Sequence, residues 1–315
     1  RRDSKGRRMP NDRIRLAELA KEPLPDEGFS VDRDGLQSNF SRHAYETAVQ
    51  RIRDYIAAGD VYQVNLSQRF ETRFQGNAFG FFRALYERNP APFFAFINAG
   101  DHAVVSTSPE RFIKLADGRV ETRPIKGTRP RGESATQDAA LRTELLRSEK
   151  DRAENVMIVD LLRNDLGKVC RPGSIEVPGL FQVESFATVH HLVTTVTGQL
   201  EEGRDALDLI AACFPGGSIT GAPKRRAMQI IDELEPVRRE VYCGNVIRLG
   251  FDGDLASSIT IRTALLCGNR LCYWAGGGIV ADSDCAAEYQ ESLDKAAAFL
   301  TLIGQPLASF QRSKK

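Results

Sequence analysis

The sequence predicts a mixed α+β fold built as one large domain. Three observations predict it. Segments with the two-residue alternation of strands occur in groups, segments with a helical apolar stripe separate these groups, and no obvious linker divides residues 40–305. This order differs from the regular strand–helix alternation of a doubly wound parallel fold. A chain of 315 residues can bury a large core without disulfides or structural metals.

Seven segments have the periodicity of helices. In residues 43–58 the apolar side chains fall on one stripe that includes Val49 and Ile52, and Gly59 follows as a stop signal. The other predicted helices are 78–87, 135–146, 149–165, 205–212, 223–234 and 285–302.

Strand patterns begin with residues 61–70. This segment places Val64 and Leu66 on one face and Gln63 on the other, as a half-buried strand does. The other predicted strands are 93–98, 103–106, 111–115, 174–185, 192–199, 244–251, 257–266 and 271–274.

The two ends of the chain are predicted to lie outside the main domain, which spans residues 41–305. We interpret residues 1–40 as a linker or the remnant of an N-terminal region, irregular in structure. Residues 1–16 carry seven Lys or Arg side chains, so a basic nucleic-acid arm is the alternative. Residues 306–315 have the composition of a polar tail. Because the chain starts with Arg rather than Met, we expect that a natural N-terminal region is missing.

Composition excludes several classes of protein. The formal net charge is +1, whereas nucleic-acid-binding proteins are usually strongly basic. No apolar run reaches the roughly 18–20 residues that cross a bilayer, and no signal peptide is visible. The six cysteines form no CxxC motif, and only four histidines are present, so a zinc cluster is not expected. We therefore expect a cytoplasmic protein with reduced, mostly buried thiols that binds neither nucleic acid nor membrane.

Two glycine-rich runs are typical of close backbone approach. Residues 214–224 (FPGGSITGAPK) precede a helical pattern, and backbone N–H groups in such a loop can hold an anion. Ala222 stands where a phosphate-binding Walker loop has lysine, so that motif is absent. A tight structural turn is the alternative. Gly276, Gly277 and Gly278 follow a strand, and they indicate close approach of a ligand or another strand.

Carboxylates are paired at a spacing of three residues on two predicted helices. Asp151 and Glu154 share one helical face, and Glu288 and Glu291 share another. Like charges held together favour a neutralising cation, and oxygen ligands favour Mg²⁺. A solvated helix face beside Lys and Arg is the alternative.

Three further residues are candidates for chemistry. Lys126 lies between Pro124 and Gly127, and a partly buried lysine with a lowered pKa can act as a nucleophile or a base. A lysine exposed in a turn is the alternative. Arg262 lies in a predicted strand of β-branched residues and needs an anionic partner, either a side chain or a ligand carboxylate. His191 follows another histidine at the start of a strand, where a core histidine is the commoner case.

The order of these motifs resembles that of the chorismate-utilising enzymes over residues 40–300, and most closely the branch that aminates ring carbon 4. The resemblance implies a sandwich of two large antiparallel sheets flanked by helices. The matching stretches are Ser108-Pro-Glu-Arg-Phe112, Pro124-Ile-Lys-Gly-Thr128, 151–167 (DRAENVMIVDLLRNDLG), Val189-His-His-Leu-Val193, 214–224, Ile261-Arg-Thr263, 276–283 (GGGIVADS) and Glu288-Tyr-Gln-Glu291.

The resemblance also implies a set of binding residues. Glu154 and Glu291 would bind Mg²⁺, and Asp151 and Glu288 would reach it directly or through water. Most relatives have Glu where Asp151 stands. The ion would hold the ring carboxylate of chorismate. The groups implied for binding the enolpyruvyl carboxylate are Tyr242, Arg262, Lys295 and the backbone N–H groups of Gly276, Gly277 and Gly278. In the glycine-rich loop, the residues implied to face the substrate are Thr220 and Gly221.

The implied reaction depends on two positions. Anthranilate synthases have a small residue where this chain has Lys126, and isochorismate and salicylate synthases have lysine where it has Gln63. The resemblance implies that Lys126 attacks ring carbon 2, that Glu110 is the general acid and base, and that His191 has a supporting role. The product would be 4-amino-4-deoxychorismate, on the route to para-aminobenzoate and folate.

Ammonia would come from glutamine through a separate glutaminase subunit, or be used free. Two alternatives remain open. One is anthranilate synthesis, which Lys126 argues against. The other is a non-catalytic chorismate-binding protein, which has no need of a nucleophile.

Overall fold

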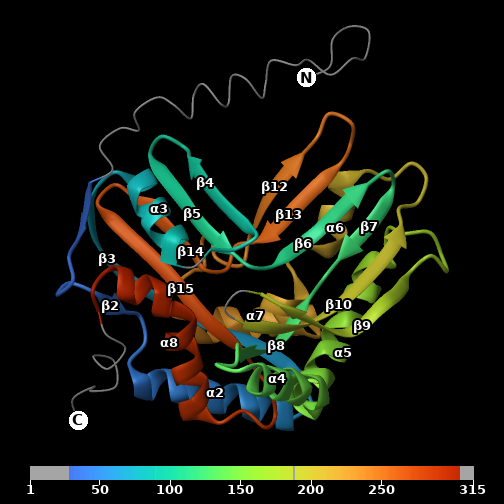
Figure 1. Ribbon diagram of the computed structural model, residues 1–315, viewed down its shortest axis with the longest axis horizontal. Helices are drawn as coiled ribbons and strands as arrows, with labels where there is room; N and C mark the ends of the chain where they lie inside the picture. Colours follow the sequence, from blue (N-terminus) through green and yellow to red (C-terminus); the bar gives the residue numbers. More distant parts are fainter. Residues whose placement is uncertain (1–27, 89, 187–188, 306–315) are drawn as a thin grey trace, which may run out of the picture.

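The computed structural model describes residues 28–88, 90–186 and 189–305, and they form two antiparallel sheets (Figure 1). The eight-stranded sheet contains β1 (Phe29–Val31), β2 (Gln37–Ser38), β3 (Gln63–Gly76), β4 (Phe93–Asn98), β5 (His102–Ser108), β11 (Gly221–Ala222), β14 (Thr263–Cys267) and β15 (Arg270–Ile279). The seven-stranded sheet contains β6 (Arg111–Ala116), β7 (Arg119–Thr122), β8 (Ile125–Pro130), β9 (Glu176–Ser185), β10 (Val189–Gln199), β12 (Asn245–Leu249) and β13 (Leu255–Ile259).

Neighbouring strands are antiparallel throughout both sheets. The order of the larger sheet is β1-β3-β15-β14-β5-β4, with β2 and β11 also paired to β3. The order of the smaller sheet is β12-β13-β6-β7-β10-β8, with β9 also paired to β10. This confirms the α+β class expected from the sequence.

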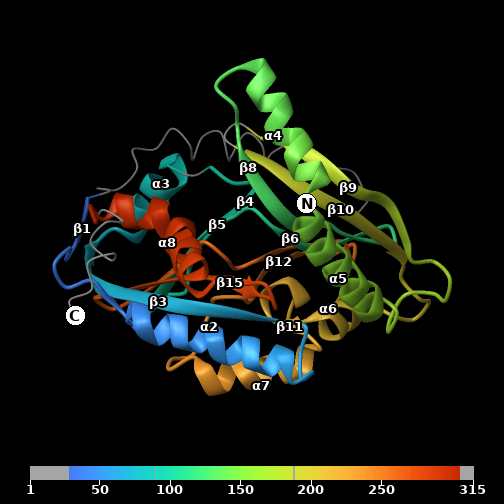
Figure 2. The same ribbon diagram turned by 90° about the horizontal axis from the view of Figure 1, so that it is seen from below.

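The helices match the seven predicted from periodicity to within two residues at each end. Serine or aspartate side chains cap the N-termini of five of them, including Ser41 before α2 and Ser148 before α5. Figure 2 shows α2 and α7 running along β3. The helices are α2 (Arg42–Ala57), α3 (Ala78–Arg88), α4 (Ala135–Arg147), α5 (Glu149–Leu166), α6 (Ala206–Cys213), α7 (Lys224–Leu234) and α8 (Cys285–Leu302), and Gly217–Ile219 form a 3₁₀ turn.

The larger sheet has a hydrophobic core on each face. Alternation along β15 sends Leu271 and Tyr273 into the core under α2, α3 and α8, and sends Cys272 and Trp274 into a second core. The second core also contains Phe112 from the smaller sheet, together with residues of α5 and α6. The two sheets therefore face each other across this core, as the resemblance implied.

The main departures from the predicted elements lie at strand ends and short strands. The stretch predicted to be irregular contains β1 and β2, which pair with β3, so the sheet begins before residue 40. The predicted strand 257–266 is two strands, because the chain breaks at residues 260–262 and Arg262 takes a left-handed φ of 50°. The sequence pattern did not predict β7 or β8. The basic stretch of residues 1–16 and the predicted polar tail of residues 306–315 lie outside the described residues.

Two further expectations concern cysteines and membranes. All six cysteines lie within the described residues, none is in a disulfide, and four are buried, which confirms the prediction of free thiols. Within residues 28–88, 90–186 and 189–305, no helix is both long and apolar enough to cross a membrane.

The topology leaves part of β15 without a neighbour on one side. Residues 270–273 pair with β14 on one edge, whereas residues 270–279 pair with β3 on the other. The edge of β15 beyond Tyr273 is therefore not covered by β14, and three adjacent glycines lie there. The largest group of predicted site residues gathers at this edge.

Candidate active site

A cavity of about 990 Å³ opens at the uncovered edge of β15. Strands of both sheets and helices α5 and α8 contribute to its wall. Twelve of the residues predicted from the sequence line it: Glu110, Lys126, Asp151, Glu154, His191, Tyr242, Arg262, Gly276, Gly278, Glu288, Glu291 and Lys295. The fold thus brings residues from distant parts of the sequence to one place.

Lys126 enters the cavity from β8, not from the turn in which the sequence pattern placed it. Its side chain is 13% exposed, and its Nζ lies 3.9 Å from Oε2 of Glu154. Burial lowers the pKa of Lys126, and although Glu154 and Glu110 oppose this shift, the positive charge of Lys295 adds to it. The neutral amine, which is the nucleophilic form, is therefore more accessible here than in an exposed lysine.

Glu110 is buried in the loop before β6, and its pKa is raised to about 7. Burial is the largest cause, and the Lys126 charge and a hydrogen bond from Ser218 partly oppose it. The Ser218 hydroxyl donates to Oε1 of Glu110 at 3.1 Å. A carboxyl group that titrates near neutrality can both give and take a proton. Ser218 was missed by the sequence reasoning, although it lies within the glycine-rich run.

Four carboxylates face the cavity from α5 and α8. Asp151 pairs with Arg129 at 3.3 Å, Glu291 pairs with Lys295 at 2.7 Å, and Glu288 accepts a hydrogen bond from Ser283 at 2.6 Å. Burial raises the pKa of Glu154 and of Glu288, and in each the negative charge of Glu291 contributes to the rise. Burial also acts on Glu291, but its contacts with Lys295 prevail and lower its pKa.

These carboxylates fit a hard divalent cation by their chemistry. Oε2 of Glu288 is buried and has no hydrogen-bond partner in the protein, so one oxygen at this site is left for a ligand. Oxygen ligands of this kind suit Mg²⁺. In the described part of the chain, however, no three acidic, histidine or cysteine side chains are grouped closely enough to hold an ion. The arrangement is one of ion pairs with Lys126, Lys295 and Arg129.

Backbone and cationic groups at the edge of β15 lie beside the carboxylates of α8. Nζ of Lys295 donates to the carbonyl of Gly276 at 3.0 Å. The N–H and C=O of one strand residue point to the same edge, so the N–H of Gly276, and that of Gly278 two residues later, face the cavity. Gly277 does not line the cavity, but a Cβ there would lie 3.1 Å from Oε2 of Glu288. These groups suit an anionic ligand.

Arg262 lies in the break between β13 and β14, not within a strand as predicted. Its backbone carbonyl accepts hydrogen bonds from the N–H and the hydroxyl of Thr107, which fixes its left-handed conformation. Its positive charge helps to lower the pKa of His191, for which burial is the largest cause. Nδ1 of His191 lies 2.9 Å from the Thr128 hydroxyl.

Two predicted residues of the glycine-rich loop lie outside the cavity wall. The Thr220 hydroxyl donates to the carbonyl of Gly216 at 2.8 Å, and Gly221 pairs with Val64 in β11. Ser218 and Ile219 line the cavity instead. Tyr242, by contrast, is buried in the wall, with its ring stacked on Trp274 at a centroid distance of 6.2 Å.

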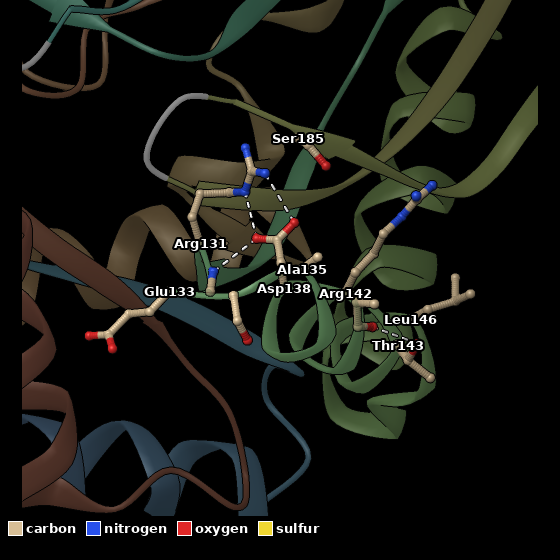
Figure 3. Close-up of a pocket in the computed structure, with 11 residues that line it drawn as sticks. Arg131, Glu133, Ala135, Asp138, Arg142, Thr143, Leu146 and Ser185 are labelled. Atoms are coloured by element: carbon tan, nitrogen blue, oxygen red, sulfur yellow. Dashed lines mark hydrogen bonds and ion pairs between the residues drawn. The ribbon is translucent and has the colours of Figure 1, made fainter.

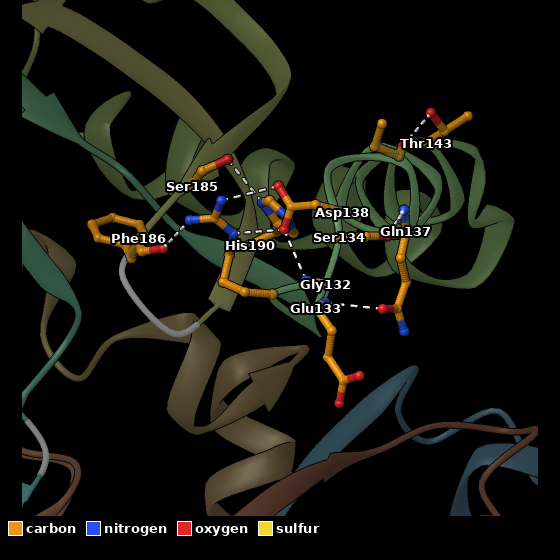
Figure 4. Close-up of polar contacts among 11 residues, drawn as sticks. Gly132, Glu133, Ser134, Gln137, Asp138, Thr143, Ser185, Phe186 and His190 are labelled. Carbon is orange, nitrogen blue, oxygen red and sulfur yellow. Dashed lines mark hydrogen bonds and ion pairs between the residues drawn. The ribbon is translucent and has the colours of Figure 1, made fainter.

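A second, open pocket of about 660 Å³ lies between α4 and the ends of β8 and β9 (Figure 3). Asp138 of α4 accepts hydrogen bonds there from the Arg131 side chain and from the N–H of Gly132. Figure 4 shows that His190 also reaches this carboxylate. His190 is fully buried, so for this residue the interpretation as a core histidine is confirmed.

Comparisons with known proteins show which proteins the chain is similar to. A family model described as chorismate binding enzyme matches residues 3–301. Aminodeoxychorismate synthase component 1 of Klebsiella aerogenes is 53% identical over 281 residues, which are 89% of this chain and 62% of the relative. Anthranilate synthase component 1 of Aquifex aeolicus is 45% identical over 267 residues, 85% of this chain and 54% of the relative.

The solved structures include anthranilate synthase component I from Streptococcus pneumoniae. It is 38% identical, has a TM-score of 0.79, and the match covers 92% of this chain and 64% of that one. The chain thus spans about three fifths of the length of the curated relatives it matches.

Proposed function

Since the chain belongs to the chorismate-binding enzyme family, we propose that it aminates chorismate at ring carbon 4 to form 4-amino-4-deoxychorismate. The observation that carries the proposal is Lys126, a largely buried amine with a lowered pKa in the same cavity as Glu110. The identities support it too, because relatives named aminodeoxychorismate synthase component 1 reach 53%, against 45% for one named anthranilate synthase component 1.

In the first step the neutral amine of Lys126 attacks ring carbon 2 of chorismate. The two ring double bonds shift and the hydroxyl on carbon 4 leaves as water, with its proton supplied by Glu110. The products are a secondary ammonium adduct on Lys126, a water molecule and the Glu110 carboxylate. The pKa of Glu110, near 7, allows it to be protonated before this step and ionised after it.

In the second step ammonia attacks ring carbon 4. Its lone pair forms the new carbon–nitrogen bond, the double bonds shift back, and the bond between carbon 2 and the lysine nitrogen breaks. Lys126 leaves as a neutral amine, and the positive charge passes to the new amino group. Dividing one displacement into two covalent steps is the usual advantage of a nucleophilic catalyst.

The substrate carries two carboxylates, and the cavity has cationic groups for them. We assign the enolpyruvyl carboxylate to Arg262, Lys295, Tyr242 and the N–H groups at the β15 edge. Glu154 and Glu291, with Asp151 and Glu288, would hold Mg²⁺ for the ring carboxylate. When bound, the ion supplies a positive charge that draws electron density from the ring diene. His191, beside Arg262, has a supporting role at the substrate.

The ammonia is proposed to come from glutamine through a partner glutaminase subunit. Two relatives at 53% identity are named component 1, which is consistent with a second component. The product would feed para-aminobenzoate and folate synthesis.

The second candidate function is anthranilate synthesis, because relatives of that name match at up to 45% identity. Incubation with chorismate, Mg²⁺ and ammonia tests both candidates. Amination at carbon 4 retains the enolpyruvyl group, so neither pyruvate nor a fluorescent product should form. Release of pyruvate with anthranilate fluorescence would establish the second function, and absence of any turnover would favour a chorismate-binding protein without activity.

A further inference from the structure

The carboxylate of Asp138 accepts hydrogen bonds from His190 on β10 and from Arg131 and Gly132, which follow β8. We infer that Asp138 and His190 are positioning residues that fix the His191 ring at the substrate, an inference that rests on the proposed function. Neither residue lines the active-site cavity. They act through β10, on which His190 and His191 are neighbours whose side chains point to opposite faces.

His190 is the buried centre of this network. Its Nε2 lies 3.0 Å from Oδ1 of Asp138 on α4, and its Nδ1 lies 2.8 Å from the Ser185 hydroxyl on β9. A carboxylate only accepts hydrogen bonds, so Nε2 carries the proton, and the Ser185 hydroxyl donates to Nδ1 when the ring is neutral. The ring therefore joins α4 to β9 through β10, with every polar atom satisfied (Figure 4).

Arg131 extends the network to the ring of His191. Its Nε and Nη2 bind the two oxygens of Asp138 at 2.7 and 3.0 Å, and its Nη1 donates to the carbonyl of Phe186 at 2.8 Å. The ring of Phe186 lies against that of His191, with a centroid distance of 5.5 Å. Asp138 thus binds His190, the residue before His191, directly. Through Arg131 it also holds Phe186, whose ring lies against that of His191.

The same network reaches the strand of Lys126. Arg131 and Gly132 directly follow β8, whose Thr128 pairs with His191 in the sheet and meets its Nδ1 at 2.9 Å. The N–H of Gly132 donates to Asp138 at 2.8 Å, and a Cβ on Gly132 would lie 2.2 Å from the backbone nitrogen of Asp138. The end of β8 is therefore packed tightly on the start of α4, and this close approach requires glycine.

Ser185, His190 and Asp138 include the residue types of a hydrolytic triad, but their arrangement does not favour hydrolysis. Hydrogen bonds from Arg131 and Gly132 hold the pKa of Asp138 well below its usual range, so the carboxylate is already neutralised by a permanent cation. The hydrogen bonds instead suit a structural role, in which they hold α4, β9, β10 and the end of β8 in fixed positions.

The test compares variants in kinetics and in the spectrum of His191. Asp138→Asn removes the charge and leaves one acceptor oxygen for the donors of Arg131, Gly132 and His190, and His190→Leu removes both ring hydrogen bonds. We expect each to lower kcat about tenfold or more, with KM for chorismate changed less than threefold. His190→Gln retains an N–H donor toward Asp138 and should recover most of the activity. Asp60→Asn, which breaks the ion pair of 2.6 Å with Arg226 away from the cavity, is the matched control and should keep the parental kcat.

A second measurement is independent of the reaction. The chain has four histidines, so the ring signals of His191 can be assigned in a histidine-labelled sample by His191→Gln. Asp138→Asn and His190→Leu should shift and broaden these signals, whereas Asp60→Asn should leave them unchanged. Parental kcat and unshifted His191 signals in folded Asp138→Asn and His190→Leu would overturn the inference. If the parent does not aminate chorismate but the signals shift, the proposed function fails and the positioning of His191 stands.

Discussion

Nζ of Lys126 on β8 lies 3.9 Å from Oε2 of Glu154 on α5. The amine proposed as the nucleophile thus borders one of the carboxylates proposed for Mg²⁺. In the proposed mechanism, covalent attack on the ring and binding of the ring carboxylate are thus the roles of two neighbouring side chains. They come from two elements with only α4 between them in the chain.

Removing one carboxylate of the proposed metal site should abolish turnover without unfolding the protein. Glu291→Gln is expected to lower kcat by about 100-fold or more, because a bound cation contributes several kcal/mol to stabilising charge in the transition state. Mg²⁺ should raise the melting temperature of the parent and not of the variant. Glu201→Gln, at a partly exposed glutamate paired with Arg204 away from the cavity, is the control. Full activity of Glu291→Gln in the presence of a chelator would exclude the assigned site.

Arg262 is expected to serve the substrate more than the stability of the fold. Arg262→Lys keeps the positive charge but loses the planar fork that binds a carboxylate by two hydrogen bonds. KM for chorismate should rise about tenfold or more, while the melting temperature changes by little. An unchanged KM with a large loss of thermal stability would make the residue structural. The exposed Arg248→Lys on β12 provides the baseline for both measurements.

Glu110 should give the reaction a pH dependence centred near neutrality. The first step requires its protonated form, so kcat should fall as pH rises through about 7. Glu110→Gln cannot give up a proton and should lose about 100-fold or more in kcat. The pH–rate profile of the parent, compared with that of Ser218→Ala, checks the assignment. Without the Ser218 hydrogen bond, which lowers the pKa of Glu110, the fall in rate should move to higher pH.

The same raised pKa predicts how stability depends on pH. Burial raises the pKa of Glu110 from 4.5 to about 7, so the folded state binds the proton more tightly than the unfolded state. The resulting stabilisation is fully present below about pH 4.5 and is lost as pH rises through 7. Glu110→Gln removes this dependence. The stability of the variant relative to that of the parent should therefore be higher at pH 8 than at pH 5. Urea unfolding at the two pH values measures the difference, and a stability difference of opposite sign would contradict the buried, proton-binding state of Glu110.

The glycines of β15 should differ in what they contribute. A Cβ on Gly276 would lie 2.1 Å from the backbone oxygen of Leu66, so Gly276→Ala must displace β3 and should lower the free energy of unfolding by about 2 kcal/mol or more. A Cβ on Gly277 would meet the Glu288 carboxylate at 3.1 Å, and a side chain can move aside. Gly277→Ala should therefore weaken the response to Mg²⁺ with a smaller loss of stability. Equal losses of stability in the two variants would contradict the expected difference between a Cβ that meets backbone and one that meets a movable side chain.

Most of the fold could be predicted from periodicity because its helices are long and amphipathic. The seven helices and the longer strands follow from the spacing of residues such as Val49 and Ile52. The sequence pattern did not predict β8, since Pro124, Gly127 and several charged side chains mask its alternation. The break at Arg262 was also missed, because β-branched residues surround it and only the tertiary contacts of its carbonyl with Thr107 select the left-handed backbone.

The site could be predicted from the sequence only where a motif carries its own chemistry. The carboxylate pairs on α5 and α8 follow from helical spacing, but their convergence on one cavity depends on the packing of two sheets. The burial that changes the pKa of Lys126 and of Glu110 comes from residues far away in the chain. Ser218 lies in a recognised motif, yet only the structure distinguishes it from Thr220, whose hydroxyl is used within the loop.

The central claim is that Lys126 attacks the ring of chorismate, and the most direct test is to trap the adduct. The parent is incubated with chorismate and Mg²⁺ but without ammonia, then digested and analysed by mass spectrometry. The account predicts a mass increase on the peptide that contains Lys126, absent in Lys126→Ala and discharged when ammonia is added to the parent. Parental turnover by Lys126→Ala, with no adduct in the parent under any trapping condition, would contradict the account.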